Sequence, residues 1–319
     1  MIMQTMKEIF EEIETNGGMT PSRRLRDIAN RFPEQIAFRD KRYGIWNEMS
    51  YKEFWMEVQY VGCALNYFGI QKTEKVAIHS ENRPEWLIAD IGVQAIGGIT
   101  VGLYPTNPPA EVQYLLSHSE SKILFAEDQE QVDKALEVLD EVPNLSKIIY
   151  FEEKGLFRYD SEKLMRWDEF LEIGKEEYEK NKDFVNFCID EIKSEDVALM
   201  IYTSGTTGPP KASMLSHGNM EWTASIIPDL SFTPNISNPE YLSYLPLCHV
   251  FGRLVDEIIA INSIGTINFA ESIDTVQRDL AEIQPSIFPA VPRILERMHA
   301  GTLVTVSYTH LTLPTNDRV

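Results

Sequence analysis

The 319-residue sequence predicts an α/β fold in which mostly parallel strands alternate with helices. Three observations support this prediction. Short apolar runs recur along the chain, segments with helical spacing of apolar residues separate them, and the connections between them are short. A strand–helix–strand order of this kind is typical of a parallel sheet covered by helices on both faces. Hydrophobic residues at 43% and charged residues at 24% also fit a globular protein.

The first half of the chain has the clearest pattern. Ser50 and Glu53 form a capping box that predicts the start of a helix, and Pro84 predicts the first turn of another. We interpret the two histidines of this half, His79 and His118, as structural. The expected strands are 76–79, 97–101, 122–126 and 147–151, and the expected helices between them are 84–96, 110–117 and 128–139.

The second half resumes the alternation after an irregular stretch. Residues 152–195 are acidic, rich in lysine and weakly patterned, so we interpret them as a surface excursion between two sheet subdomains, 36–152 and 196–300. The strands expected after this excursion are 197–202, 241–245 and 265–270, and the expected helices are 219–227, 253–261 and 275–283.

One loop carries most of the functional prediction. It follows the strand 197–202 and is dense in hydroxyl groups and glycines, with a lysine at its end. Glycine lets successive backbone amides point at one anion, and lysine adds a positive charge. We therefore expect this loop, between a strand and a helix that Ser216 opens, to bind a polyphosphate. The candidate residues are Thr203, Ser204, Gly205, Thr206, Thr207, Gly208 and Lys211.

Two other interpretations of the loop fit less well. An ordinary turn between strand and helix does not need hydroxyl residues packed between glycines. A Walker A loop needs a hydroxyl residue directly after its lysine to hold magnesium, whereas Ala212 follows Lys211 and Pro210 precedes it.

Charge and cysteine content restrict partners and location. The net charge of −20 argues against a nucleic-acid partner, because phosphate backbones would be repelled. Three widely spaced cysteines indicate free thiols in a reducing cytosol. Cys248 and His249 are adjacent, but no neighbouring residues have zinc-ligand spacing. No stretch approaches the ~20 apolar residues of a membrane span. We expect a cytoplasmic protein and leave a peripheral membrane contact open.

The stretch from Tyr202 to Lys211 resembles the phosphate loop of the adenylate-forming (AMP-binding) enzymes, which include acyl-CoA synthetases, peptide-synthetase adenylation domains and luciferases. The family usually has glycine where this chain has Ala212. Residues 244–249, Tyr-Leu-Pro-Leu-Cys-His, are similar to the family's Leu-Pro-Leu-x-His segment.

Two later segments, 268–272 and 291–293, look most like the long-chain fatty-acid–CoA ligase branch, and the resemblance extends from about residue 21 to residue 300. The resemblance implies an acyl-CoA synthetase-like large N-terminal domain made of two α/β subdomains. It also implies that a fatty acid and ATP give an acyl-adenylate and pyrophosphate, and that coenzyme A then displaces AMP. Mg²⁺ is the expected metal cofactor.

Residue roles follow from the same resemblance. The loop residues 203–208 and Lys211 would hold the β- and γ-phosphates, and His249 would lie beside the acyl carboxylate and the α-phosphate. Without the resemblance we would interpret His249 as a core histidine. Long-chain ligases often have an acidic residue three positions after that histidine, where this chain has Gly252. This departure concerns the acyl side and leaves the ATP prediction unchanged.

Several family motifs are absent after Lys211, namely the aromatic-Gly-x-Thr-Glu segment, the ribose-binding aspartate, the hinge and the late catalytic lysine. Residues 301–319 resemble a translated sequencing-adapter or cloning-linker read-through and are set aside as a non-native tail. We therefore expect a truncated AMP-binding domain at 1–300, without the small C-terminal domain, that is an inactive fragment. Two alternatives stay open: another carboxylate-adenylating enzyme, and a non-catalytic nucleotide-binding fragment. Acyl-chain length and oligomeric state are not predicted.

Overall fold

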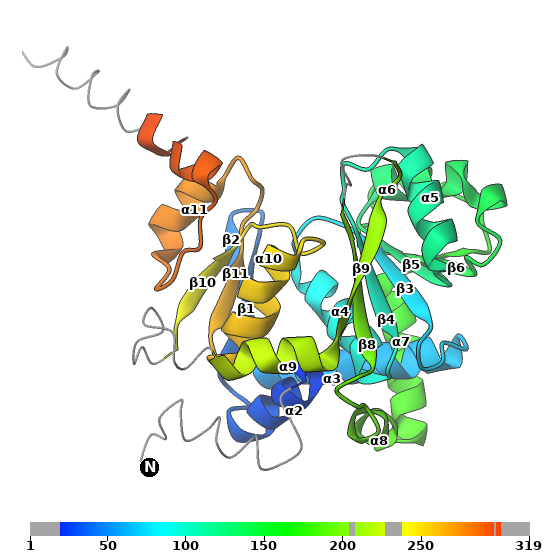
Figure 1. The fold of residues 1–319 in the computed structure, drawn as a ribbon, viewed down its shortest axis with the longest axis horizontal. Helices are drawn as coiled ribbons and strands as arrows, with labels where there is room; N and C mark the ends of the chain where they lie inside the picture. The colour runs from blue at the N-terminus through cyan, green and yellow to red at the C-terminus, as the bar shows by residue number, and fades with distance from the viewer. Residues whose placement is uncertain (1–19, 204–207, 227–237, 297, 301–319) are drawn as a thin grey trace, which may run out of the picture.

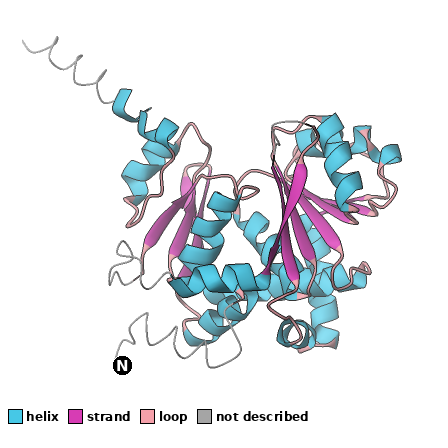
Figure 2. Ribbon diagram, in the orientation of Figure 1, coloured by secondary structure: helices cyan, strands magenta, loops and turns pink. Residues whose placement is uncertain are grey.

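The computed structural model describes residues 20–203, 208–226, 238–296 and 298–300. Its strands form two sheets with helices packed between and around them (Figure 1, Figure 2). The predicted α/β class is therefore confirmed. The interpretation of residues 301–319 as a non-native tail lies outside the described residues.

The larger sheet has seven strands in the order β7-β6-β5-β3-β4-β8-β9. All neighbours are parallel except β8 and β9. The central strands β3, β4 and β5 are almost entirely buried, as a parallel sheet covered on both faces requires. The strand bounds are β3 Lys75–His79, β4 Ile99–Leu103, β5 Ile123–Ala126, β6 Lys147–Tyr150, β7 Leu164–Arg166, β8 Val197–Thr203 and β9 Lys211–Ser216. The strand predicted at 97–101 begins two residues later, because Gly97 has φ +75° and closes the preceding helix.

The smaller sheet has four strands in the order β10-β11-β1-β2. Their bounds are β1 Ile36–Arg42, β2 Ile45–Ser50, β10 Glu240–Ser243 and β11 Thr266–Phe269. Sheet membership therefore does not follow the predicted division into 36–152 and 196–300, because β1 pairs in parallel with β11 and β8 pairs in parallel with β4. The aromatic core explains the first pairing: the ring of Phe38 lies 4.2 Å from that of Phe54 and 5.5 Å from that of Phe269.

The helices cover both sheets, and one of them is buried along its whole length. This helix, α4, lies between the two sheets (Figure 1). The capping box at Ser50 and Glu53 is present at the start of α3, as predicted. The bounds are α2 Pro21–Arg31, α3 Tyr51–Tyr67, α4 Pro84–Ala95, α5 Pro109–Ser119, α6 Gln129–Glu137, α7 Trp167–Lys180, α8 Phe184–Asp190, α9 His217–Ile226, α10 Val250–Arg253 and α11 Val276–Ile283. A π-helix, η3, continues α10 over Leu254–Ala260 where an ordinary helix was expected, and a 3₁₀ turn, η1, covers Leu139–Glu141. Within the described residues, no helix combines the length and apolarity needed to cross a membrane.

The interpretation of residues 152–195 as a surface excursion is wrong. Strand β7 extends the larger sheet and α7 packs lengthwise against α3. The buried residues of α7 are Trp167, Phe170 and Gly174, at spacings of three and four, so the chain buries a narrow helical stripe in an otherwise charged sequence. Gly174 permits the close approach, because a Cβ atom there would lie 2.0 Å from the carbonyl oxygen of Tyr60.

Replacing Gly174 with valine should lower the free energy of unfolding by about 1–3 kcal/mol, since α7 must move away from α3 to admit the side chain. Urea unfolding followed by tryptophan fluorescence measures this change. Glu176→Ala, on the exposed face of the same helix, is the control and should stay within about 0.5 kcal/mol of the unmodified chain. Equal stability of the two variants would contradict the close packing.

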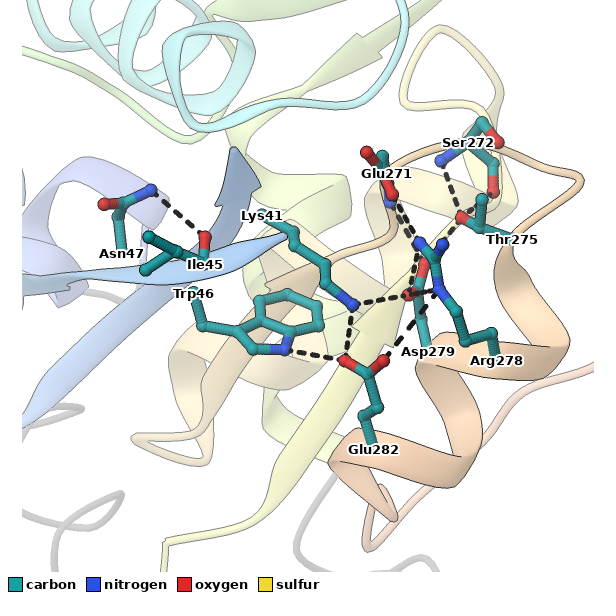
Figure 3. Close-up of polar contacts among 10 residues, drawn as sticks. All are labelled: Lys41, Ile45, Trp46, Asn47, Glu271, Ser272, Thr275, Arg278, Asp279 and Glu282. Atoms are coloured by element: carbon teal, nitrogen blue, oxygen red, sulfur yellow. Dashed lines mark hydrogen bonds and ion pairs between the residues drawn. The ribbon is translucent and has the colours of Figure 1, made fainter. Parts of the chain in front are cut away.

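Ion pairs join α11 to the β1–β2 hairpin (Figure 3). Lys41 on β1 lies 3.6 Å from a carboxylate oxygen of Asp279, and its side chain is almost completely buried. The Lys41 ammonium and the Trp46 indole both donate to Glu282, at 2.5 and 3.1 Å. These contacts and the β1–β11 pairing hold together parts of the smaller sheet that are far apart in the sequence.

Candidate functional site

The predicted phosphate loop connects two antiparallel strands. Thr203 ends β8, Lys211 begins β9, and the two residues pair directly across the hairpin. The expectation of a strand followed by a helix is therefore wrong at this point, because residues 211–216 return alongside β8 before α9 begins. Gly208 has φ +96°, a conformation that glycine adopts without strain. Ser204, Gly205, Thr206 and Thr207 lie outside the described residues.

A cavity of about 460 Å³ lies beside the described end of the hairpin. Thr203 and Pro210 line it on one side and His249 lines it on another. The structure thus brings together Thr203, at the start of the predicted phosphate loop, and the predicted site residue His249, which are 46 positions apart in the sequence. Tyr202 of β8 also lines it, and the other lining residues come from the end of β4 and from α5 with the segment before it: Gly102, Tyr104, Thr106, Asn107, Pro108, Glu111 and Leu115.

His249 is exposed and caps α10. Its Nδ1 atom accepts a hydrogen bond of 3.1 Å from the backbone N–H of Phe251. In the neutral ring the proton is therefore on Nε2, which is left to face a ligand as a donor. This exposure contradicts the alternative interpretation of His249 as a core histidine.

Two contacts hold the segment that carries His249 against the larger sheet. A Cβ atom on Gly102 would lie 2.8 Å from the Cα atom of Cys248, so the end of β4 can approach this closely only without a side chain. The amide of Asn82 donates to Leu245 O at 2.7 Å and accepts from Leu247 N at 3.0 Å. The Asn82 side chain thus provides a hydrogen-bond partner for both the Leu245 carbonyl and the Leu247 N–H of this turn.

A buried charged cluster lies directly behind this segment. The Arg253 guanidinium donates to Leu247 O at 3.1 Å and to Asp90 Oδ2 at 2.6 Å. It also lies 3.3 Å from Glu257 Oε2 and 4.6 Å from the centre of the Trp86 ring. Arg253 therefore connects the His249 segment, helix α4 and the π-helix η3.

The described residues contain no group of three or more His, Cys, Asp or Glu side chains placed to hold a metal ion. Burial raises the pKa of the Cys248 thiol to about 12, so this residue stays protonated at neutral pH. The described residues alone therefore do not form a carboxylate cage for Mg²⁺.

A family model described as AMP-binding enzyme matches residues 25–314. The chain belongs to the AMP-binding enzyme family. Its resemblance to adenylate-forming enzymes, drawn from the phosphate loop and the segment ending at His249, is thereby confirmed.

Relatives with curated descriptions agree with the AMP-binding assignment. The chain is 31% identical over 280 residues to long-chain-fatty-acid–CoA ligase ACSBG2 of Xenopus laevis, covering 86% of this chain and 37% of that protein. It is 31% identical over 287 residues to the Homo sapiens ACSBG2, covering 88% of this chain and 42% of that protein. The chain thus spans about two fifths of the length of these relatives.

Solved structures of similar fold confirm the acyl-CoA synthetase-like architecture. A putative long-chain-fatty-acid CoA ligase from Rhodopseudomonas palustris matches with a TM-score of 0.71 at 19% identity, covering 88% of this chain and 65% of that one. Coronafacic acid ligase from Pectobacterium brasiliense matches with a TM-score of 0.72 at 18% identity, covering 88% of this chain and 51% of that one.

Sequence reasoning missed the residues that hold this candidate site together. Asn82 and Arg253 both act on the backbone of the His249 segment, yet neither belongs to the predicted phosphate loop. The only sequence signal for Asn82 is its place in a polar turn between a predicted strand and the helix that begins at Pro84. Arg253 is the first residue of the helix expected at 253–261, and nothing next to it in the sequence indicates a contact with the His249 segment.

Proposed function

We propose that this chain carries the ATP-binding and acyl-adenylate-forming part of a long-chain fatty-acid–CoA ligase. The observation that supports this proposal best is the single cavity lined by Thr203, Pro210 and His249. Membership of the AMP-binding enzyme family and the ACSBG2 relatives support the reaction class.

The proposed chemistry joins two anions, so charge neutralisation and alignment dominate it. A fatty-acid carboxylate oxygen attacks the α-phosphorus of ATP, the bond to the bridging oxygen of the β-phosphate breaks, and pyrophosphate leaves. The loop residues 203–208 and Lys211 hold the β- and γ-phosphates. His249 donates from Nε2 near the carboxylate and the α-phosphate. Coenzyme A is the acceptor of the acyl group in the second step, with AMP as the leaving group.

Mg²⁺ fits this site only as an ion carried on the phosphate oxygens of ATP, since the described residues offer no cage of their own. Bound there, it would neutralise phosphate charge. The hydroxyl residue Thr203 borders the same space, and its role in binding ATP does not depend on the ion.

Replacing Lys211 with alanine should weaken ATP binding about tenfold, because a charge-assisted contact to phosphate is worth roughly 1.5–3 kcal/mol when well formed and less at an exposed position. Lys211 is exposed and starts β9. Isothermal titration calorimetry of the 319-residue chain with ATP measures the dissociation constant. Lys182→Ala, an exposed lysine beyond α7, is the matched control. Equal affinities for all three proteins would reject the phosphate-loop assignment.

The choice among carboxylate substrates needs a separate measurement. ATP–pyrophosphate exchange with palmitate, benzoate and amino acids, on a chain extended to the length of the relatives, distinguishes a fatty-acid ligase from other adenylating enzymes. Exchange that depends on palmitate supports the proposal, and exchange that depends on an amino acid contradicts it. For the 319-residue chain alone we expect ATP binding without acyl-CoA formation.

A further inference from the structure

Side chains of helix α5, which is labelled in Figure 1, contact the described residues at both ends of the predicted phosphate loop. At the end of the loop, the Tyr114 hydroxyl donates to Pro210 O at 3.0 Å. At its start, His118 Nδ1 and the Tyr202 hydroxyl are 2.7 Å apart. Tyr114 and His118 are four positions apart on α5 and therefore share one face of the helix.

The three rings form a continuous array. The ring of Tyr114 lies 5.4 Å from that of His118, which lies 5.7 Å from the ring of Tyr202 in an edge-to-face arrangement. Burial raises the pKa of Tyr202 to about 12, so its hydroxyl stays protonated at neutral pH and can donate to His118 Nδ1.

Strand register explains why two contacts are enough to fix the loop. Tyr202 pairs with Ala212 and Thr203 pairs with Lys211, so the residues held by α5 directly adjoin Thr203 and Lys211, both of which are predicted to meet phosphate. β9 is an edge strand whose other side has no partner among the described strands. Without α5, the described end of the hairpin would depend on the β8–β9 ladder alone.

We propose that Tyr114 and His118 are positioning residues for the phosphate loop, holding its two ends against α5 so that Thr203 and Lys211 present a fixed spacing to the nucleotide. The proposal rests on the proposed function, because it takes the loop to be the phosphate site. Neither residue needs to touch ATP. The same helix also lines the cavity through Glu111 and Leu115, so it connects the cavity wall to the loop.

Three variants test the contacts one atom at a time. Tyr114→Phe removes the hydroxyl and keeps the ring. His118→Ala removes the partner of Tyr202, whereas His118→Asn restores an acceptor close to the Nδ1 position. Tyr159→Phe is the matched control, since it deletes a hydroxyl whose hydrogen bonds are to Asp133 and Gln129 and not to the loop. Calorimetric titration should show ATP binding about threefold to tenfold weaker for Tyr114→Phe and His118→Ala, with near-normal binding for His118→Asn and Tyr159→Phe.

A second readout does not depend on ATP. Trypsin cleavage after Lys211, in the absence of nucleotide, should become about threefold to tenfold faster in Tyr114→Phe and His118→Ala, relative to cleavage after the exposed Lys154 in the same chain. A general loss of stability would raise cleavage at both sites and leave their ratio unchanged. An unchanged ratio, or failure of His118→Asn to restore it, overturns the proposal. Absence of ATP binding by the unmodified chain would count against the proposed function alone, and the cleavage ratio would still decide whether α5 holds the loop.

Discussion

Replacing Arg253 with methionine is expected to lower the free energy of unfolding by about 3–5 kcal/mol, because two buried carboxyl groups lose their cation. Arg253 and Asp90 are 2.6 Å apart, Glu257 is 3.3 Å away, and all three side chains are at most 2% exposed. Methionine keeps much of the apolar volume over Trp86, so the loss reports the missing charge more than a cavity. Urea unfolding followed by tryptophan fluorescence gives the difference.

A second substitution separates charge from packing. Adding Asp90→Asn to Arg253→Met removes the carboxylate that the first change leaves unpaired. The double variant should therefore lose less free energy of unfolding than the sum of the losses in the two single variants, by about 1 kcal/mol or more. Simple additivity would show that the two groups do not act as a pair. Arg158→Met, which removes an exposed arginine, serves as the control and should change stability by less than about 0.5 kcal/mol.

The Arg253 cluster also shows how far sequence reasoning can reach. Local signals predicted elements well: the capping box at Ser50 and the proline at position 84 mark helix starts that the structure confirms. Such signals act within a few residues and are complete in the sequence itself. Arg253 and Asp90 are 163 positions apart, and nothing local in either segment indicates that they meet.

Strand pairing was the least predictable part of the fold. Strand β9 was missed because it lies at a sheet edge and alternates only weakly, with Met214 exposed at 63%. The pairing of β1 with β11 joins segments more than 200 positions apart, so no turn sequence between them specifies it. Helix α7 was missed for a different reason: its apolar stripe is narrow and one of its buried positions is a glycine.

The candidate site divides in the same way. The dense motif from Thr203 to Lys211 could be interpreted chemically from its residue types alone, since glycines, hydroxyls and a lysine suit a polyphosphate. His249 could be assigned only through family resemblance, because a lone histidine after a proline turn has no chemistry of its own. The residues that hold the site, Tyr114 and His118, act through one face of a helix distant in sequence and needed coordinates to be found.

Stability should fall as the pH rises from about 7 to 8, and the cause lies in the same buried cluster. Burial, with the neighbouring Asp90 charge, raises the pKa of Glu257 to about 8, and burial raises the pKa of Asp256 to about 7. In the unfolded chain both carboxyls lose their protons near pH 4. Between these values the folded state binds more protons, so each group lowers the stability as the pH rises from about 4 up to its folded pKa, and its contribution is constant above that pKa.

The buried histidines act in the opposite direction but over a lower range. Burial lowers the pKa of both His79 and His217 to about 4, so the unfolded state binds more protons up to about pH 6.5 and stability rises with pH there. Above pH 7 that contribution has ended and the buried carboxyls determine the slope, among them Glu57, whose pKa burial raises to about 7. A single such group changes the free energy of unfolding by at most about 1.4 kcal/mol per pH unit. We therefore expect a loss of about 1 kcal/mol between pH 7 and 8.

Glu257→Gln provides the decisive comparison, because glutamine keeps the shape of the protonated carboxyl and has no proton to lose in this range. Its unfolding free energy, measured in urea at pH 6, 7 and 8, should fall markedly less from pH 7 to 8 than that of the unmodified chain, and Asp256 should contribute to the slope that remains. Glu137→Gln, at an exposed position on α6, should keep the slope of the unmodified chain. If the Glu257 variant retains the full slope, Glu257 is ionised in the folded state at neutral pH. In that case Arg253 would have to neutralise both carboxylates, and the loss expected for Arg253→Met would become larger.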